Sequence, residues 1–429
     1  MATVGQPPIE TPGQRAATAS GGRARARRTL MPPVLQRMPP GPRTLLFAII
    51  LFALAALFPI VDGDTSQVYT GVEACSFAIL ALGLNVVVGY AGLLDLGYAA
   101  FYAIGAYAFG LVGSAQFQPG ASLNLRLGSL QIFTMGQDGI HANFWLFLPL
   151  AALVAALFGV ILGAPTLRLR GDYLAIVTLG FGEIVPSIVR NLGPNNIFSW
   201  PNITGGENSL SGIDQPSLGS LQFTDPRPWY YLSLVVLALI ALIATRLRSS
   251  RLGRAWVAIR EDELAASCMG INLVRTKLLA FGMGAFFSGF AGMIIGSFLG
   301  AINPDNFAFQ VSVAILCAVV LGGMGSIPGV ILGGLIIGIL QYSLLDQVTT
   351  WLGNVGSSTN ISVLQPDHVS GLKYLIFGAI LVLMMIFRRE GILPNRRRAI
   401  ELHADEADIV QDENQPLYDV RDGKSTISG

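Results

Sequence analysis

The chain has 429 residues, of which 52% are hydrophobic and only 12% are charged. Soluble domains carry about 25% charged residues, so this composition excludes an ordinary water-soluble fold and predicts a protein of the lipid bilayer. The three cysteines, Cys75, Cys268 and Cys317, lie far apart and predict neither a disulfide framework nor a metal site.

Long apolar runs predict about ten transmembrane helices, because a helix that crosses a bilayer needs about 20 mostly apolar residues. The runs lie roughly at 44–61, 68–90, 97–115, 144–166, 172–189, 229–245, 278–301, 307–325, 327–345 and 371–387. Gly89, Gly92 and Gly97 crowd between the second and third runs, so the sequence leaves open whether these two spans are full, broken or re-entrant. The predicted fold class is an all-α polytopic membrane protein.

Three regions follow from this pattern. Residues 1–43 are rich in Pro, Gly and Arg and are expected to form a disordered basic arm. Residues 44–390 are the predicted transmembrane domain; its first run is long for a leader and ends in Phe58-Pro59 without an A-x-A site, so we expect it to be retained. Residues 391–429 form an acidic tail.

The distribution of positive charge predicts the orientation. Ten crossings put both termini on one side, and a cytoplasmic N-terminus places nearly all of the 27 Lys and Arg residues in inner segments. The exceptions are Arg126, Arg190, Arg227 and Lys373. We therefore expect a multi-pass protein of the cell inner membrane with both termini in the cytoplasm.

Three polar residues fall within or beside the predicted spans: Asn85, Asp95 and Glu183. A polar group in lipid costs several kcal/mol unless it finds a partner, so each is a candidate for the translocation path. The alternative is a structural hydrogen bond between helices. Arg190 lies seven residues after Glu183, on roughly the same helix face, and offers a weak ion-pair partner.

Glycines spaced four residues apart predict close helix packing. One set comprises Gly292, Gly296 and Gly300, and the other comprises Gly325, Gly329 and Gly333. Such stripes indicate a tight bundle and carry no information about function.

The segment 246–276 is the longest predicted inner loop between spans. Residues 261–269 favour a helix, with Glu261, Asp262 and Glu263 at its N-terminal end and Gly270 as a natural C-cap. A short amphipathic helix on the inner membrane face can press into a groove of a cytoplasmic protein. The alternative is a helix that merely lies on the membrane surface.

Within this loop, the run Ala265-Ala266-x-x-x-Gly270 resembles the coupling motif of ABC importer permeases, in which an E-A-A triplet is followed three residues later by Gly. The chain departs from the motif at Leu264, which occupies the acidic position, while Glu263 lies one position earlier.

Three further stretches resemble the branched-chain amino acid permeases of that family, the LivM-like subunit in particular. They are 83–97 (GLNVVVGYAGLLDLG), 168–175 (RLRGDYLA), and 302–304 (INP) followed by 321–329 (LGGMGSIPG). With the loop, the resemblance covers roughly residues 70–390.

The resemblance implies a permease subunit of an ATP-driven importer that moves Leu, Ile or Val across the inner membrane by alternating access. It implies a second homologous permease, two cytoplasmic ATP-binding subunits, an external solute-binding protein and membrane lipid as partners, and no nucleic acid. ATP would be used by the partners, so the chain itself is expected to bind no cofactor and to be no enzyme. The implied ATPase-coupling residues are Glu261, Asp262, Glu263, Ala265, Ala266 and Gly270.

Other functions remain open at this point. Within the family, urea, short amides or other amino acids are alternative substrates. From another class, an ion-coupled secondary transporter would need intramembrane acids or histidines; Glu183 qualifies, but His141 and His368 lie in predicted outer segments. An intrinsic ATPase is not supported, because Tyr418 occupies the upstream glycine position of the only P-loop candidate, at 423–425.

The predicted outer segments are 116–143, 190–228 and 346–370. They are either docking surfaces for a soluble partner or passive connectors.

Overall fold

The structure is a computed structural model that describes residues 52–60, 64–114, 123–127, 130–136, 139–167, 169, 172–193, 202–218, 221–344, 347–348, 350–351, 378–379, 382 and 391–393. The predicted arm 1–43, most of the spans 44–61 and 371–387, most of the segment 346–370 and the tail beyond 393 lie outside these residues. The chain divides into two units, Met1–Leu57 and Phe58–Gly429. In the first unit the described residues are helical. All helices and sheets named in the following paragraphs belong to the second unit.

Within the described residues, six helical stretches are long and apolar enough to cross a membrane. They comprise α4 (Thr65–Leu84) continued by η1 (Asn85–Tyr90), α6 (Phe144–Thr166), α7 (Asp172–Asn191), α8 (Pro226–Ser249), α11 (Leu273–Leu299), and η3 (Pro304–Phe307) followed by α12 (Phe309–Gly322). Two shorter apolar helices are α5 (Ala99–Gly110) and α13 (Ile327–Ile339), the latter continued by η4 (Leu340–Leu344). The expected total of about ten spans is therefore established only in part.

The run at 97–115, for which the sequence left open a full, broken or re-entrant span, forms a helix too short to cross the bilayer. Its helix, α5, has 12 residues, which is about 18 Å of helix against a hydrocarbon core of about 30 Å. The helix stops because the chain after Gly110 turns to pair with a strand: Ile140 N–H donates to Ser114 O at 3.2 Å. The expected span at 68–90, in contrast, is full length, since α4 and η1 run without a break from Thr65 to Tyr90.

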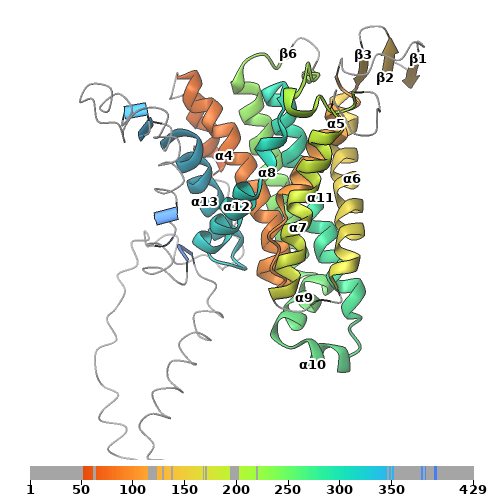
Figure 1. The fold of residues 1–429 in the computed structure, drawn as a ribbon. Helices are drawn as coiled ribbons and strands as arrows, with labels where there is room; N and C mark the ends of the chain where they lie inside the picture. Colours follow the sequence, from red (N-terminus) through yellow and green to blue (C-terminus); the bar gives the residue numbers. More distant parts are fainter. Residues whose placement is uncertain are drawn as a thin grey trace, which may run out of the picture. The chain divides into compact units, whose positions relative to one another are not determined.

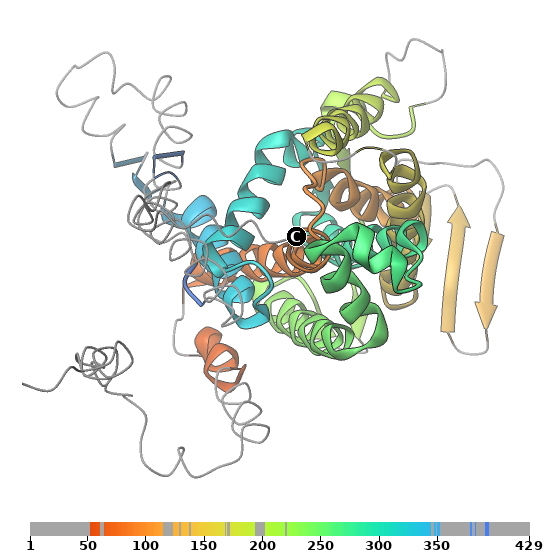
Figure 2. The ribbon, with the colours of Figure 1, turned by 90° about the horizontal axis from the view of Figure 1, so that it is seen from below.

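The centre of the bundle is formed by α4 and α11, the two most buried spans (Figures 1 and 2). Helix α11 packs against α6, α5 and α4, and α4 packs in addition against α13 and α8. A side chain at Gly292 of α11 would collide with the backbone carbonyl of Tyr102 on α5. The two backbones touch here, as the predicted small-residue stripe requires.

Of the six glycines predicted for helix packing, Gly300 and Gly325 have another role. Gly296 packs against Ile302, and Gly329 and Gly333 lie against the backbone of α12. Gly300, however, has open space around it and ends α11 with φ +66°, and Gly325 lies in the turn before α13 with φ +81°. A left-handed backbone conformation favours glycine at both positions.

An all-α fold is also not fully correct, because the described residues include three small antiparallel sheets, which lie at the end of the bundle opposite α9 and α10 (Figure 1). The largest comprises β1 (Leu123–Leu127), β2 (Leu130–Gly136) and β3 (Gly139–Ala142). The others pair β4 (Leu210–Ser211) with β7 (Ala301–Ile302), and β5 (Ser217–Leu218) with β6 (Leu221–Gln222). The alternation of leucines in 123–127 has the period of a strand, which is the signal in the sequence for β1.

Candidate functional site

The segment between α8 and α11 forms a hairpin of two helices, α9 (Arg251–Glu261) and α10 (Glu263–Cys268), across one end of the bundle (Figures 1 and 2). The single helix expected over 261–269 is wrong, because the chain is extended at Asp262 (φ −155°, ψ 113°). The carboxylate of Asp262 accepts hydrogen bonds from Leu264 N (2.7 Å) and Ala265 N (3.0 Å), and so caps a new helix. Glu261 consequently belongs to α9.

The end of α10 confirms the predicted cap at Gly270. Gly270 N–H donates to Ser267 O at 3.0 Å and Ile271 N–H donates to Ala266 O at 3.1 Å, the two bonds of a Schellman motif. Gly270 has φ +82° and no atom within 4 Å of the position that a Cβ would take. Backbone conformation alone therefore requires glycine at this position.

The hairpin is clamped to α11 by buried contacts. The fully buried Trp256 donates from Nε1 to Thr276 O at 2.7 Å. Glu263 Oε1 and Lys277 Nζ form an ion pair at 2.6 Å, in which the lysine side chain is only 8% exposed. Ala266 is also buried. These contacts attach both helices of the hairpin to α11.

The outer side of α10 carries exposed apolar side chains. Leu264 is 74% exposed and Met269 is 82% exposed, with the exposed Ala265 between them. Large apolar groups held on a rigid exposed helix are typical of a surface that fits into a groove of another protein.

The three acids of the hairpin differ in their surroundings. Asp262 caps α10 and Glu263 pairs with Lys277, so both have partners within the chain. Glu261 is exposed and has no hydrogen-bond or ion-pair partner among the residues that the structure describes. Of the three, Glu261 is the acid that remains available to another protein.

The three predicted path residues do not converge. Asn85 begins η1, is buried, and accepts a hydrogen bond from Gly325 N at 2.8 Å. Asp95 is buried between η1 and α5, whereas Glu183 is exposed on α7. The weak ion pair considered between Glu183 and Arg190 does not form, because Arg190 reaches instead to Asp305 of η3.

Asp95 borders a small pocket. Its Oδ1 accepts from Gly97 N at 2.9 Å, while its buried Oδ2 has no hydrogen-bond partner in the described part of the chain. Thr166 and Thr178 line the same pocket, which has room for about one water molecule. This space is too small for an amino acid.

A fourth polar residue inside a predicted span, the acid Glu73, was not among the residues predicted from the sequence. It lies in α4, is 91% buried, and interacts electrostatically with Tyr69 and Tyr102. The signal was available, because Glu73 is an acid inside the predicted span 68–90.

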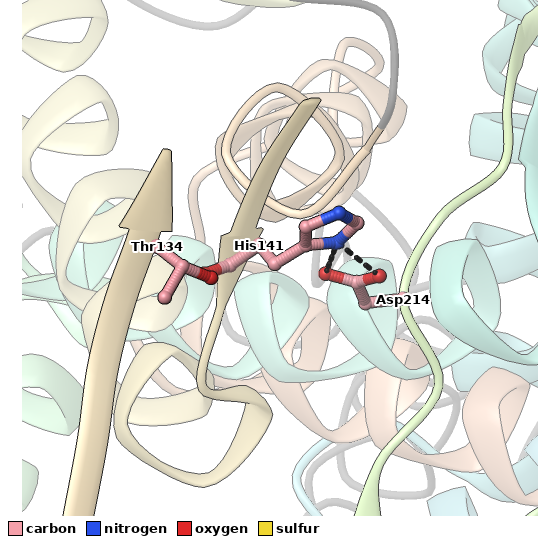
Figure 3. A network of polar contacts seen from close by, with 3 residues as sticks. All are labelled: Thr134, His141 and Asp214. Carbon is pink, nitrogen blue, oxygen red and sulfur yellow. Dashed lines mark hydrogen bonds and ion pairs between the residues drawn. The ribbon is translucent and has the colours of Figure 1, made fainter. Parts of the chain in front are cut away.

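A polar contact at the sheet end of the bundle was also missed (Figure 3). His141 Nδ1 on β3 lies 2.9 and 3.0 Å from the two carboxylate oxygens of Asp214, and Thr134 Oγ1 donates to His141 O at 3.4 Å. Burial raises the pKa of the Asp214 carboxyl, and the hydrogen bond and charge of His141 act against this rise. The pair joins the three-stranded sheet to the segment 202–218, a contact over 73 positions that no local pattern predicts.

Apolar spans around two central helices, with buried polar groups and a rigid helical hairpin at one end, define a multi-pass helical membrane permease. Residues 68–385 match the family described as "Branched-chain amino acid transport system / permease component", and the chain belongs to this family.

Several curated proteins are similar to the chain. It is 37% identical over 385 residues to the high-affinity branched-chain amino acid transport system permease protein LivM of Salmonella typhimurium, covering 84% of this chain and 78% of the relative. For LivM of Escherichia coli the identity is 37% over 381 residues, covering 83% and 76%. The permease protein LivH of Salmonella typhimurium is 28% identical over 276 residues, covering 64% and 84%. No solved structure matches the chain.

Proposed function

We propose that the chain is the LivM-like permease subunit of an ATP-driven importer that carries Leu, Ile and Val across the inner membrane by alternating access. The carrying observation is the α9–α10 hairpin, which is clamped to the central helix α11 yet presents Leu264 and Met269 to the outside. Similarity to LivM over most of both chains supports the substrate class.

The hairpin is the proposed contact with the ATP-binding subunits. Leu264 and Met269 would enter a groove of the ATPase, and Ala265 would allow its close approach. The Glu261 carboxylate would offer a negative charge to the ATPase. The structure of the hairpin would be maintained by Asp262, Glu263, Ala266 and Gly270. ATP is used by these partners, so the chain needs no cofactor and catalyses no reaction itself.

The hairpin and both termini are proposed to face the cytoplasm. The basic residues between Arg246 and Lys277 support this, because positive charge is retained on the inner side. The sheets at the opposite end of the bundle would then face an external solute-binding protein.

The exposed face of α7 is proposed to border the substrate path and a second, LivH-like permease. The exposed faces of α6 and α8 are apolar through the middle of each span, as lipid requires. Helix α7 exposes the apolar Ile184 and Ile188 as well, but it differs in exposing Glu183, Ser187 and Asn191, which are four residues apart and thus on one face. A carboxylate in the middle of a span is costly against lipid but not beside an aqueous path. Asn85 and Asp95 lie inside the bundle and would join the path only after a change of conformation.

Uptake by the reconstituted complex tests the proposal. The chain, its partner permease, the ATP-binding subunits and the solute-binding protein are placed in proteoliposomes, and uptake of labelled leucine and of labelled urea is measured with and without ATP. We expect ATP-dependent leucine uptake. Urea uptake alone would assign the chain to amide transport, and leucine uptake driven by an ion gradient without ATPase would make it a secondary transporter.

A further inference from the structure

The last turns of the central helix α4 are wound as a π-helix, η1 (Asn85–Tyr90). The irregular winding continues beyond it, with Leu93 N–H donating to Val87 O at 3.1 Å. Short π-helical stretches inside longer helices are rare and frequently lie at functional sites. The contacts of η1 with the rest of the chain indicate what this element connects.

Two hydrogen bonds join η1 to distant parts of the chain. Arg260, near the end of α9, donates from its guanidinium group to Gly89 O at 2.7 Å. From the other side, Gly325 N–H in the turn between α12 and α13 donates to Asn85 Oδ1 at 2.8 Å. The two bonds span 171 and 240 sequence positions. Through η1 the hairpin is therefore connected to α4 and to the beginning of α13.

The contacts along this route leave no free space. A Cβ at Gly89 would overlap the Asn85 side chain and approach Gly325 N to 2.9 Å. Gly92 has φ +70°, and a Cβ there would lie 2.7 Å from Arg260 Cγ. In addition, Ile392 and Leu393 donate to Leu321 O and Gly322 O at the end of α12. Close-packed groups transmit a displacement instead of absorbing it.

The bond from Arg260 is not needed to hold the hairpin in place. Trp256 and Glu263 already attach α9 and α10 to α11. Arg260 is the residue that connects the hairpin to a different helix, α4, and it does so at a carbonyl of the π-helical turn.

We infer that Arg260, Gly89 and Asn85 form a relay in which movement of the α9–α10 hairpin changes the winding of η1 and thereby moves the α12–α13 turn. The inference rests on the proposed function, because the hairpin moves only if a motor acts on it. Arg260 and Asn85 are positioning residues: neither contacts the substrate or ATP. The winding of η1 is the two-state element that such coupling requires.

The test compares Arg260→Gln with Arg254→Gln in the complete reconstituted complex. Arg254 lies on the same helix and also donates to a carbonyl, Ser249 O at 2.7 Å, but that carbonyl lies within the same α8–α9 corner. For Arg260→Gln we expect complex assembly and ATP hydrolysis to be kept, while leucine transported per ATP falls about tenfold. Arg254→Gln should leave this ratio unchanged, and Arg260→Lys, which keeps a donor, should restore part of it.

A double variant tests whether Arg260 and Asn85 act through one route. Arg260→Gln combined with Asn85→Ala should lose no more coupling than the stronger single variant, because both changes break the same relay. If the loss of transport per ATP in the double variant equals the product of the two single losses, the two effects are independent and the relay is overturned. Wild-type transport per ATP in Arg260→Gln would also overturn it.

A measurement without transport separates this inference from the proposed function. Amide hydrogen exchange is followed at Gly325 and in η1 of the detergent-purified protein. The relay predicts at least tenfold faster exchange in Arg260→Gln and unchanged exchange in Arg254→Gln. Equal exchange in both variants overturns the relay, whereas a wild-type complex without ATP-dependent uptake overturns the proposed function alone.

Discussion

At Gly270 the backbone, not the surrounding space, decides the residue type. The φ of +82° closes the Schellman motif of α10, while the position of a Cβ is open. A non-glycine residue can fit there sterically but must adopt a left-handed conformation, which costs about 1–2 kcal/mol.

Gly270→Ala is therefore expected to lower the free energy of unfolding by about 1 kcal/mol. Gly180 of α7 is the matched control, since it also has open space around it but has a helical backbone. Gly180→Ala should leave stability unchanged or slightly raised. Thermal unfolding in detergent measures both, and an equal midpoint for the two variants would contradict the assigned role of Gly270.

The ion pair Glu263–Lys277 predicts that neutralising Glu263 lowers stability, whereas neutralising the neighbouring Glu261 does not. Removing the Glu263 charge leaves the buried Lys277 unpaired, but Glu263 is 39% exposed, so solvent reduces the effect to about 1 kcal/mol. Glu263→Gln should lower the unfolding midpoint, and Glu261→Gln should not. A Lys277→Met change added to Glu263→Gln should recover part of the loss, which a double-mutant cycle will measure.

At the scale of the element, the hairpin combines buried anchors with an exposed apolar edge. Its inner side carries Trp256, Ile259 and Ala266, and its outer side carries Leu264 and Met269. This division predicts that docking and folding can be separated by substitution.

Leu264→Asp is expected to leave the unfolding midpoint unchanged, because the side chain is exposed in the isolated chain, and to abolish co-purification with the ATP-binding subunits. Leu252→Asp on α9 is the control at an exposed leucine of the same hairpin. It should retain the ATPase. Retention of the ATPase by both variants would show that the edge of α10 is not the docking surface.

At the scale of the whole molecule, the exposed surfaces of the spans are of two kinds. Helices α6 and α8 present apolar side chains in mid-span, whereas α7 presents Glu183 beside the exposed Ile184 and Ile188. Lipid can cover the first kind, but a charge requires water, a partner subunit or substrate.

Glu183→Leu distinguishes these environments. If α7 borders the substrate path, the variant should assemble normally and lose leucine uptake by tenfold or more, with Glu183→Gln intermediate. If α7 faced lipid, removing the charge would raise stability and leave uptake intact. Uptake in proteoliposomes and the unfolding midpoint together decide the matter.

Features with a local or periodic signal in the sequence could be predicted, whereas other features became visible only in the structure. Apolar runs, charge asymmetry and the cap at Gly270 are local or periodic properties, so the positions of α4, α6, α8 and α11 could be predicted closely. The break at Asp262 could not, because helix propensity across 261–269 is continuous and only the cap that Asp262 forms interrupts it. The sequence left the length of α5 open because the end of this helix depends on pairing with a distant strand.

The amino-acid sequence alone predicted a multi-pass membrane protein with a helical segment between two of its spans, because lipid imposes composition and period on every residue of a span. Only the tertiary structure decided which polar residues are buried and which are exposed. Asn85 and Asp95 lie inside the bundle while Glu183 faces outward, and Arg260 reaches Gly89 across 171 positions. The burial of these residues and their long-range partners arise from the packing of helices that are distant in the sequence, so no single stretch of chain predicts them.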